Sequence, residues 1–114
     1  MNLYQTLELY DRMLSHPVAH VLLGGGGVRI EGWPQMIADV FQRPIRTVQN
    51  ADASTLGAAL VAGNAVGLFE DLPGAASSMV AEQDTMIPDE SLAGTYGDLY
   101  RRYLEAYGRL HGVV

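Results

Sequence analysis

An apolar run that ends in four consecutive glycines constrains the fold of this chain more than any other stretch. The run covers residues 18–23, the glycines are Gly24–Gly27, and a helix is predicted to follow directly. Such a run predicts a strand buried on both faces, while the glycines permit backbone conformations that other residues avoid. Strand, glycine turn and helix N-terminus together present free backbone N–H groups and the positive end of a helix dipole, which suits a nucleotide.

The composition excludes several classes of protein. The chain has 114 residues, of which 48% are hydrophobic, so we expect one globular domain at most. Its net charge of −6 argues against a nucleic-acid partner, and the lack of lysine excludes a phosphate-binding P-loop. The chain has no cysteine, and its histidines, at positions 16, 20 and 111, lack ligand spacing. We therefore assign no metal to its side chains.

The chain also lacks the sequence signals of membrane insertion and secretion. No apolar run approaches the roughly 18 residues that a membrane span needs. The opening residues are amphipathic and carry neither a basic start nor a cleavage site. We therefore predict a cytoplasmic protein with no membrane partner.

Hydrophobic spacing predicts the elements of the first half. Apolar residues recur at helical spacing over residues 2–15: Leu3, Leu7, Tyr10 and Leu14. A second helix, ended by Pro44, carries five apolar residues on one face: Trp33, Met36, Ile37, Val40 and Phe41. Residues 45–48 predict a short strand, which the connecting helix places parallel to the first strand. Asp39 and Arg43, four residues apart, are expected to pair on the surface of this helix.

A helix of small residues opens the second half. Ser54 or Asp52 can cap it, and Gly57 and Gly63 lie inside it. Each internal glycine costs about 1 kcal/mol relative to alanine, so we expect compensation through close approach by another helix or by a ligand.

Three further segments complete the predicted elements. Residues 69–80 predict a short helix, and residues 80–87 predict an extended segment. An apolar and aromatic stripe from Leu92 to Leu110 predicts a last helix that ends near Gly112. This stripe is interpreted as core or interface, because no basic residues interleave with it to bind nucleic-acid bases.

Three motifs in order resemble the C-terminal end of FGGY carbohydrate kinases. The first runs from Gly25 to Asp39 and reads Gly-Gly-Gly-Val-Arg-Ile-Glu-Gly-Trp-Pro-Gln-Met-Ile-Ala-Asp. The second is Arg43-Pro-Ile, and the third begins at Asp52 and reads Asp-Ala-Ser-Thr-Leu-Gly-Ala-Ala. The similarity begins near residue 18 and continues to the end of the chain. Three motifs in this order are more specific than one glycine run.

The resemblance implies an α/β fold, a partial ribonuclease-H-like or actin-like ATPase lobe with short parallel strands and several helices. In such kinases ATP lies in a cleft between two lobes, and its γ-phosphoryl passes to a sugar hydroxyl. The small-residue helix would help to pack the two lobes together. The resemblance implies a cofactor-binding role for six residues in and beside the glycine turn: Gly25, Gly26, Gly27, Val28, Ile30 and Gln35.

The same resemblance implies what residues 1–114 lack. The Asp-x-Gly phosphate loop and the catalytic aspartate of such kinases belong to an N-terminal lobe. We therefore expect a single partial domain that binds ATP but contains no catalytic residue and phosphorylates nothing alone. Mg²⁺ would be held mainly by the absent lobe and by the nucleotide, and the sugar would be bound only by the complete enzyme.

Other interpretations stay open at this point. Ile30 stands where relatives usually carry Ser or Asn, and it cannot hydrogen-bond to adenine or ribose. A dinucleotide-binding turn fits less well, because Arg29 occupies the place of the third glycine. Trp33 is interpreted as core, and His20 as a buried group of the first strand. The alternative function is a non-catalytic remnant or interaction module, and the open sheet edge of a partial lobe predicts homo-oligomers.

Overall fold

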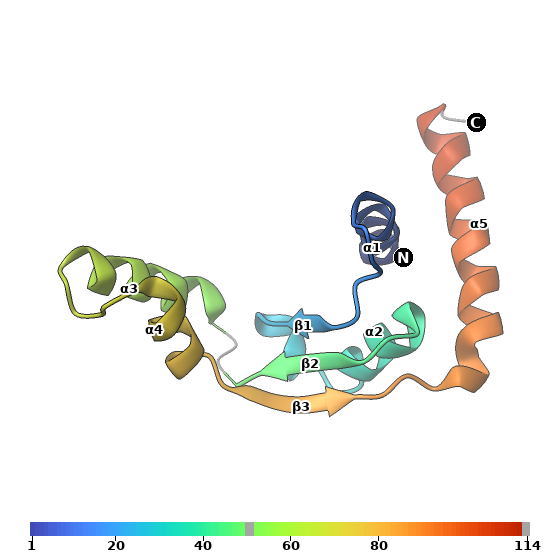
Figure 1. Cartoon of the computed structure of the whole chain (residues 1–114). Helices are drawn as coiled ribbons and strands as arrows, with labels where there is room; N and C mark the ends of the chain where they lie inside the picture. The colour runs from blue at the N-terminus through green and yellow to red at the C-terminus, as the bar shows by residue number, and fades with distance from the viewer. Residues whose placement is uncertain (50–51, 113–114) are drawn as a thin grey trace.

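The computed structural model describes residues 1–49 and 52–112, which form an elongated molecule of 52 × 31 × 28 Å. A small sheet lies in its middle (Figure 1). Two helices of the middle of the chain lie at one end, α3 (Ala53–Ala65) and α4 (Leu72–Met79). The last helix, α5 (Ala93–His111), stands at the opposite end.

The sheet has three short strands in the order β1-β2-β3: β1 (Val21–Leu23), β2 (Ile45–Val48) and β3 (Glu82–Met86). β1 and β2 are parallel, with Val21 opposite Ile45, which confirms the predicted parallel pair. The extended segment predicted at residues 80–87 contains β3, and this strand runs antiparallel to β2. The small sheet is therefore mixed.

The prediction of a first strand buried on both faces is wrong. β1 covers only three residues, and the side chain of Leu22 at its centre is 53% exposed. The physical reason is that β1 lies at the edge of the sheet, where only β2 pairs with it among the described residues. His20, expected in the interior of this strand, precedes it and is exposed.

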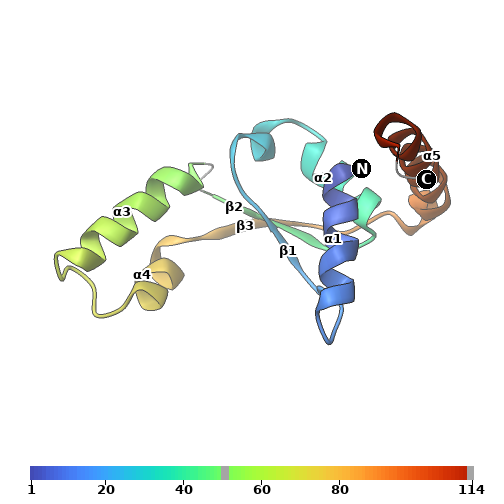
Figure 2. The same ribbon diagram turned by 90° about the horizontal axis from the view of Figure 1, so that it is seen from above.

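The core lies between the sheet and two helices, α1 (Asn2–Met13) and α2 (Trp33–Phe41). Seen from above, α1 crosses over the strands (Figure 2). The core cluster joins residues of both helices to β2: Leu7, Ile37, Ala38, Phe41 and Ile45. Trp33 is half-buried and packs against this cluster, which agrees with its predicted core role.

The expected surface pair of Asp39 with Arg43 is wrong. Asp39 is only 6% exposed, and Arg43 instead pairs with Asp11 of α1. Arg43 also donates to the carbonyl of Val18 at 2.6 Å. The reason is that α2 ends at Phe41, and the left-handed conformation of Gln42 (φ 50°) turns the chain away before Arg43 is reached.

We expect the Asp11–Arg43 pair to make the fold acid-sensitive. The hydrogen bond from Arg43, aided by one from the N–H of Val18, lowers the pKa of Asp11. Its contribution to stability is therefore complete above the ordinary pKa of aspartate and is lost as pH falls through the lowered pKa. We expect Asp11→Asn to reduce the change in urea unfolding midpoint between about pH 6 and about pH 3. An equal change in urea midpoint for Asp11→Asn and for the unsubstituted chain would contradict this role of the pair.

Aromatic rings connect α5 to the core. The ring of Tyr100 lies 4.7 Å from that of Tyr4, and its hydroxyl donates to the carboxylate of Glu8 at 2.7 Å. Burial, together with this hydrogen bond, raises the pKa of Tyr100. Farther along α5, the ring contacts continue through Tyr103 and Tyr107 to the helix end. Gly112 follows in the left-handed conformation (φ 64°), so the predicted helix end is confirmed.

The two glycines of α3 have different surroundings. A Cβ added at Gly63 would lie 2.6 Å from the ring of Phe69, so a group does approach this glycine closely, but it is an aromatic side chain and not the helix or ligand that was expected. A Cβ at Gly57 would meet nothing within 4 Å. Within the described chain, packing therefore requires a glycine at position 63 and not at position 57.

This difference predicts opposite outcomes for the same substitution. Gly57→Ala and Gly63→Ala gain the same helix propensity, but only the second forces a methyl group against Phe69. We expect Gly63→Ala to be less stable than Gly57→Ala by about 1–3 kcal/mol. Urea unfolding of the two variants measures the difference, and equal stabilities would show that Phe69 moves aside freely.

Candidate functional site

The four glycines form a turn at the carboxyl end of β1. Gly25 takes a positive φ of 89°, and Gly26–Arg29 then form one turn of 3₁₀ helix. Backbone hydrogen bonds close this turn, from the N–H of Val28 to the carbonyl of Gly25 at 3.3 Å and from the N–H of Ile30 to Gly27 at 3.1 Å. The expectation of an α-helix directly after the glycines is corrected, because α2 begins only at Trp33.

One side of the glycine turn is open. Outside its own neighbours in the chain, a Cβ added at Gly25 or Gly26 would meet no heavy atom within 4 Å. A Cβ at Gly27 would lie 3.0 Å from the indole nitrogen of Trp33, so this glycine is closed off by α2. Gly25 and Gly26 therefore present bare backbone that a ligand can approach.

Of the other three predicted site residues, Val28 and Ile30 lie in or beside the glycine turn and Gln35 lies apart from it. Val28 is half-buried in the 3₁₀ turn, and Ile30 follows with its side chain 59% exposed. Gln35 lies in α2, where its amide nitrogen donates at 2.8 Å both to Asp39 Oδ1 and to the carbonyl of Ile87. Five of the six residues thus lie in or directly beside one turn. The amide nitrogen of Gln35 lies apart from them and is already hydrogen-bonded to other groups of the protein.

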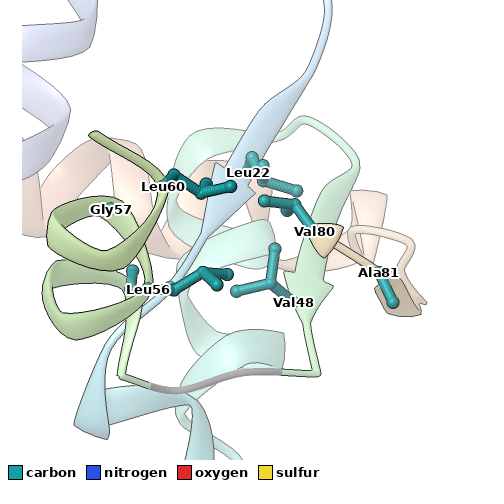
Figure 3. Close-up of a pocket in the computed structure, with 9 residues that line it drawn as sticks. Leu22, Val48, Leu56, Gly57, Leu60, Val80 and Ala81 are labelled. Carbon is teal, nitrogen blue, oxygen red and sulfur yellow. The ribbon is translucent and has the colours of Figure 1, made fainter. Parts of the chain in front are cut away.

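An apolar hollow of about 300 Å³ lies beside this turn, at the carboxyl ends of β1 and β2. Figure 3 shows side chains from the sheet and α3 converging on it. Gly24 belongs both to its lining and to the glycine run; the other lining residues are Leu22, Val48, Ala53, Leu56, Gly57, Leu60, Val80 and Ala81. Ligands of α/β proteins commonly bind outside the carboxyl ends of parallel strands.

Sequence reasoning did not identify this hollow as part of the site. Its lining comes from β1, β2, α3 and the segment before β3, which lie far apart in the chain. The one signal in the sequence was Gly57, a glycine inside a predicted helix. In the structure, an added Cβ at Gly57 would meet nothing within 4 Å, so packing does not explain this glycine. Its absent side chain leaves room at the wall of the hollow.

The described part of the chain has neither a cluster of metal ligands nor a membrane-spanning helix. Among these residues, His, Asp and Glu side chains do not gather in threes where a metal ion could be held. Each helix described here is too short or too polar to span a lipid bilayer.

The fold and the glycine turn belong to a known class of α/β protein. The family model described as "FGGY family of carbohydrate kinases, C-terminal domain" matches residues 2–66. This chain therefore belongs to the FGGY family of carbohydrate kinases, with the actin-like ATPase fold of that family. The sequence resemblance is confirmed.

Individual relatives agree with this assignment. A sugar kinase of Escherichia coli strain K12, YgcE, is 37% identical over 90 residues, which are 76% of this chain and 18% of that protein. The xylulose kinase of Bacillus subtilis strain 168 is 29% identical over 106 residues, or 93% of this chain and 21% of that protein. The chain thus spans about a fifth of the length of these relatives.

Solved structures show the same fold. A gluconate kinase from Lactobacillus acidophilus superposes with a TM-score of 0.77 and 27% identity, covering 96% of this chain and 22% of that one. A xylulose kinase from Rhodospirillum rubrum superposes with a TM-score of 0.74 and 28% identity. This match covers 97% of this chain and 22% of that one.

Proposed function

We propose that this chain is the part of an ATP-dependent carbohydrate kinase that holds the adenosine side of ATP. The observation that carries the proposal is the open backbone of Gly25 and Gly26 at the carboxyl end of a parallel strand. Membership of a carbohydrate kinase family supports the choice of ATP as ligand. In this role the chain would act in the cytoplasm.

The residues of the turn fit one side of a nucleotide. Bare glycine backbone lets a ligand come within hydrogen-bonding distance of peptide groups, which a side chain would prevent. Ile30 adds exposed apolar surface beside the turn but no hydrogen-bonding group. The neighbouring hollow is apolar and has the size of a small ligand pocket, which spans roughly 300–1,000 Å³. Adenosine, rather than the triphosphate, matches these surfaces.

The rest of the reaction would depend on other parts of a complete kinase. Phosphoryl transfer requires Mg²⁺, phosphate-binding donors and a carboxylate that orients the attacking hydroxyl. We propose that Mg²⁺ is held by the nucleotide and by an N-terminal lobe outside this single partial domain. The sugar would be bound by the complete enzyme, so the isolated chain would bind nucleotide without transferring a phosphoryl group.

Calorimetric titration of the chain with ATP and with ADP tests this proposal. We expect both nucleotides to bind, with similar affinities, because the adenosine side is common to both. A coupled assay for ADP release with xylulose or gluconate as acceptor should give no turnover by the chain alone. The absence of binding heat at millimolar ATP and ADP would overturn the nucleotide role, and turnover would overturn the proposed division of the reaction.

We also propose that the isolated chain self-associates. β1 presents an unpaired edge in the described structure. Leu22 of this strand lines a hollow together with Leu3 and Tyr10 of α1, and all three side chains are exposed. Such edges and apolar surfaces promote association between copies. We expect dimers or larger species in sedimentation velocity runs at high protein concentration. A single monomeric boundary would contradict this expectation.

A further inference from the structure

We propose that Asp39 is a positioning residue for the glycine turn. It fastens α2 to the segment Ile87–Asp89, which links β3 to α5, and α2 in turn holds Trp33 against Gly27. We call the contacts of Gln35, Asp39 and Gln42 with Ile87–Asp89 the α2 clasp. The inference rests on the proposed nucleotide role of the turn and adds to it a group that does not touch the nucleotide.

Asp39 is the centre of the clasp. One of its carboxylate oxygens, Oδ1, accepts hydrogen bonds from the N–H of Asp89 and from the Gln35 amide nitrogen, both at 2.8 Å. The same amide nitrogen donates to the carbonyl of Ile87 at 2.8 Å. Because the Asp39 residue is only 6% exposed, removing its carboxylate would leave donors without this acceptor in a largely water-free place.

Gln42 completes the clasp at the other end of α2. Its amide nitrogen donates to the carbonyl of Asp39 at 2.7 Å and to that of Asp89 at 3.1 Å. Gln42 is also the one non-glycine residue with positive φ in the described chain (φ 50°). A non-glycine residue keeps this conformation only where surrounding contacts hold it. The clasp therefore fixes both ends of the helix against one short segment, through Ile87 and Asp89.

The first turn of α2 transmits this position to the glycine turn. The N–H of Trp33 donates to the carbonyl of Ile30 at 3.1 Å, just after the 3₁₀ turn. The indole nitrogen of Trp33 would lie 3.0 Å from a Cβ on Gly27. Gln35 follows Trp33 by two residues, so a shift of α2 away from Ile87–Asp89 would move Trp33 relative to Gly27. The clasp thus sets the shape of the turn that the nucleotide would contact.

Trp33 is the chain's one tryptophan, so tryptophan fluorescence reports on the surroundings of this residue, which include Gly27 and the core cluster. We expect Asp39→Ala to shift the emission of Trp33 and to increase its quenching by acrylamide in the absence of nucleotide. We also expect it to weaken ATP binding about tenfold, which corresponds to about 1.4 kcal/mol. Asp39→Asn keeps an Oδ1 acceptor and should restore most of both signals.

Asp11→Ala is the matched control. Like Asp39, Asp11 accepts a backbone N–H, that of Val18 at 2.9 Å, but Asp11 is less buried, lies in α1 and pairs with Arg43 rather than with the clasp. It should destabilise the protein while leaving Trp33 emission and ATP affinity of the folded chain unchanged. Where Asp39→Ala does not fold, Gln35→Met removes two of the clasp bonds and is measured in its place.

The outcomes separate the clasp from the nucleotide role. A Trp33 signal that changes in the clasp variants and not in Asp11→Ala supports the clasp. An unchanged Trp33 signal in Asp39→Ala and Gln35→Met overturns it, as does an equal change in the Asp11 control. If Trp33 responds as expected but no variant or parent chain binds ATP, the clasp stands and the proposed function fails.

Discussion

Replacing Gly26 with valine is expected to weaken ATP binding at least about tenfold, or by about 1.4 kcal/mol, without loss of folding. Outside its own neighbours in the chain, a Cβ at this position meets no protein atom within 4 Å, so the new side chain begins on the open side of the turn that a ligand would approach. Gly26 also lacks a positive φ, and the substitution therefore adds no backbone strain. Calorimetric titration with ATP gives the affinity.

Gly97→Val is the control for this substitution. Gly97 lies in α5 and is equally open, with nothing within 4 Å of an added Cβ. It should leave ATP affinity unchanged. Equal affinities of the Gly26 and Gly97 variants would show that the glycine turn does not contact the nucleotide.

Truncation of Phe41 to alanine is expected to lower the free energy of unfolding by about 3–5 kcal/mol. Phe41 is 8% exposed and belongs to the cluster that joins both N-terminal helices to β2. Its ring also lies 5.9 Å from that of Tyr4, so its loss opens a cavity next to α1. Urea unfolding followed by circular dichroism measures the effect.

Leu110→Ala provides the comparison on the surface. Leu110 is 82% exposed near the end of α5, and its truncation should change the free energy of unfolding by no more than about 0.5 kcal/mol. A loss at Leu110 as large as that at Phe41 would mean that the stabilising core lies on α5 instead.

The parts of the fold set by local signals could be predicted from the sequence. The left-handed glycine after α5 and the parallel pairing of β1 with β2 appear as expected. The predicted apolar face of α2 is confirmed in part, because Ile37 and Phe41 are buried whereas Met36 is 39% exposed. Each depends on residues within one element or on the length of the connection between two. The family resemblance added the fold, because its motifs occur in the same order in complete kinases.

Features that depend on distant partners could not be predicted. The carboxylate of Asp39 accepts from an N–H that is 50 positions away in the chain, and its spacing from Arg43 alone suggested a surface pair. The apolar run before the glycines suggested a buried strand, but no strand covers the outer edge of β1 in the described chain. Periodicity reports which residues are apolar, not which surfaces are covered.

The candidate site could likewise be predicted only in part from the sequence. Glycine content alone predicted an open turn, and Gly25 and Gly26 are open. Closure of Gly27 by Trp33, and the hollow shared with α3, depend on how α2 and α3 pack beside the turn. No local pattern of residues carries that information.

Amide chemical shifts of the isotope-labelled chain during titration with ATP would locate the nucleotide contacts residue by residue. We expect the largest shift changes at Gly25–Ile30, with smaller changes at residues lining the hollow, such as Leu22 and Leu56. No shift changes at millimolar ATP would contradict the account, as would changes confined to the exposed arginines of α5, Arg101 and Arg102.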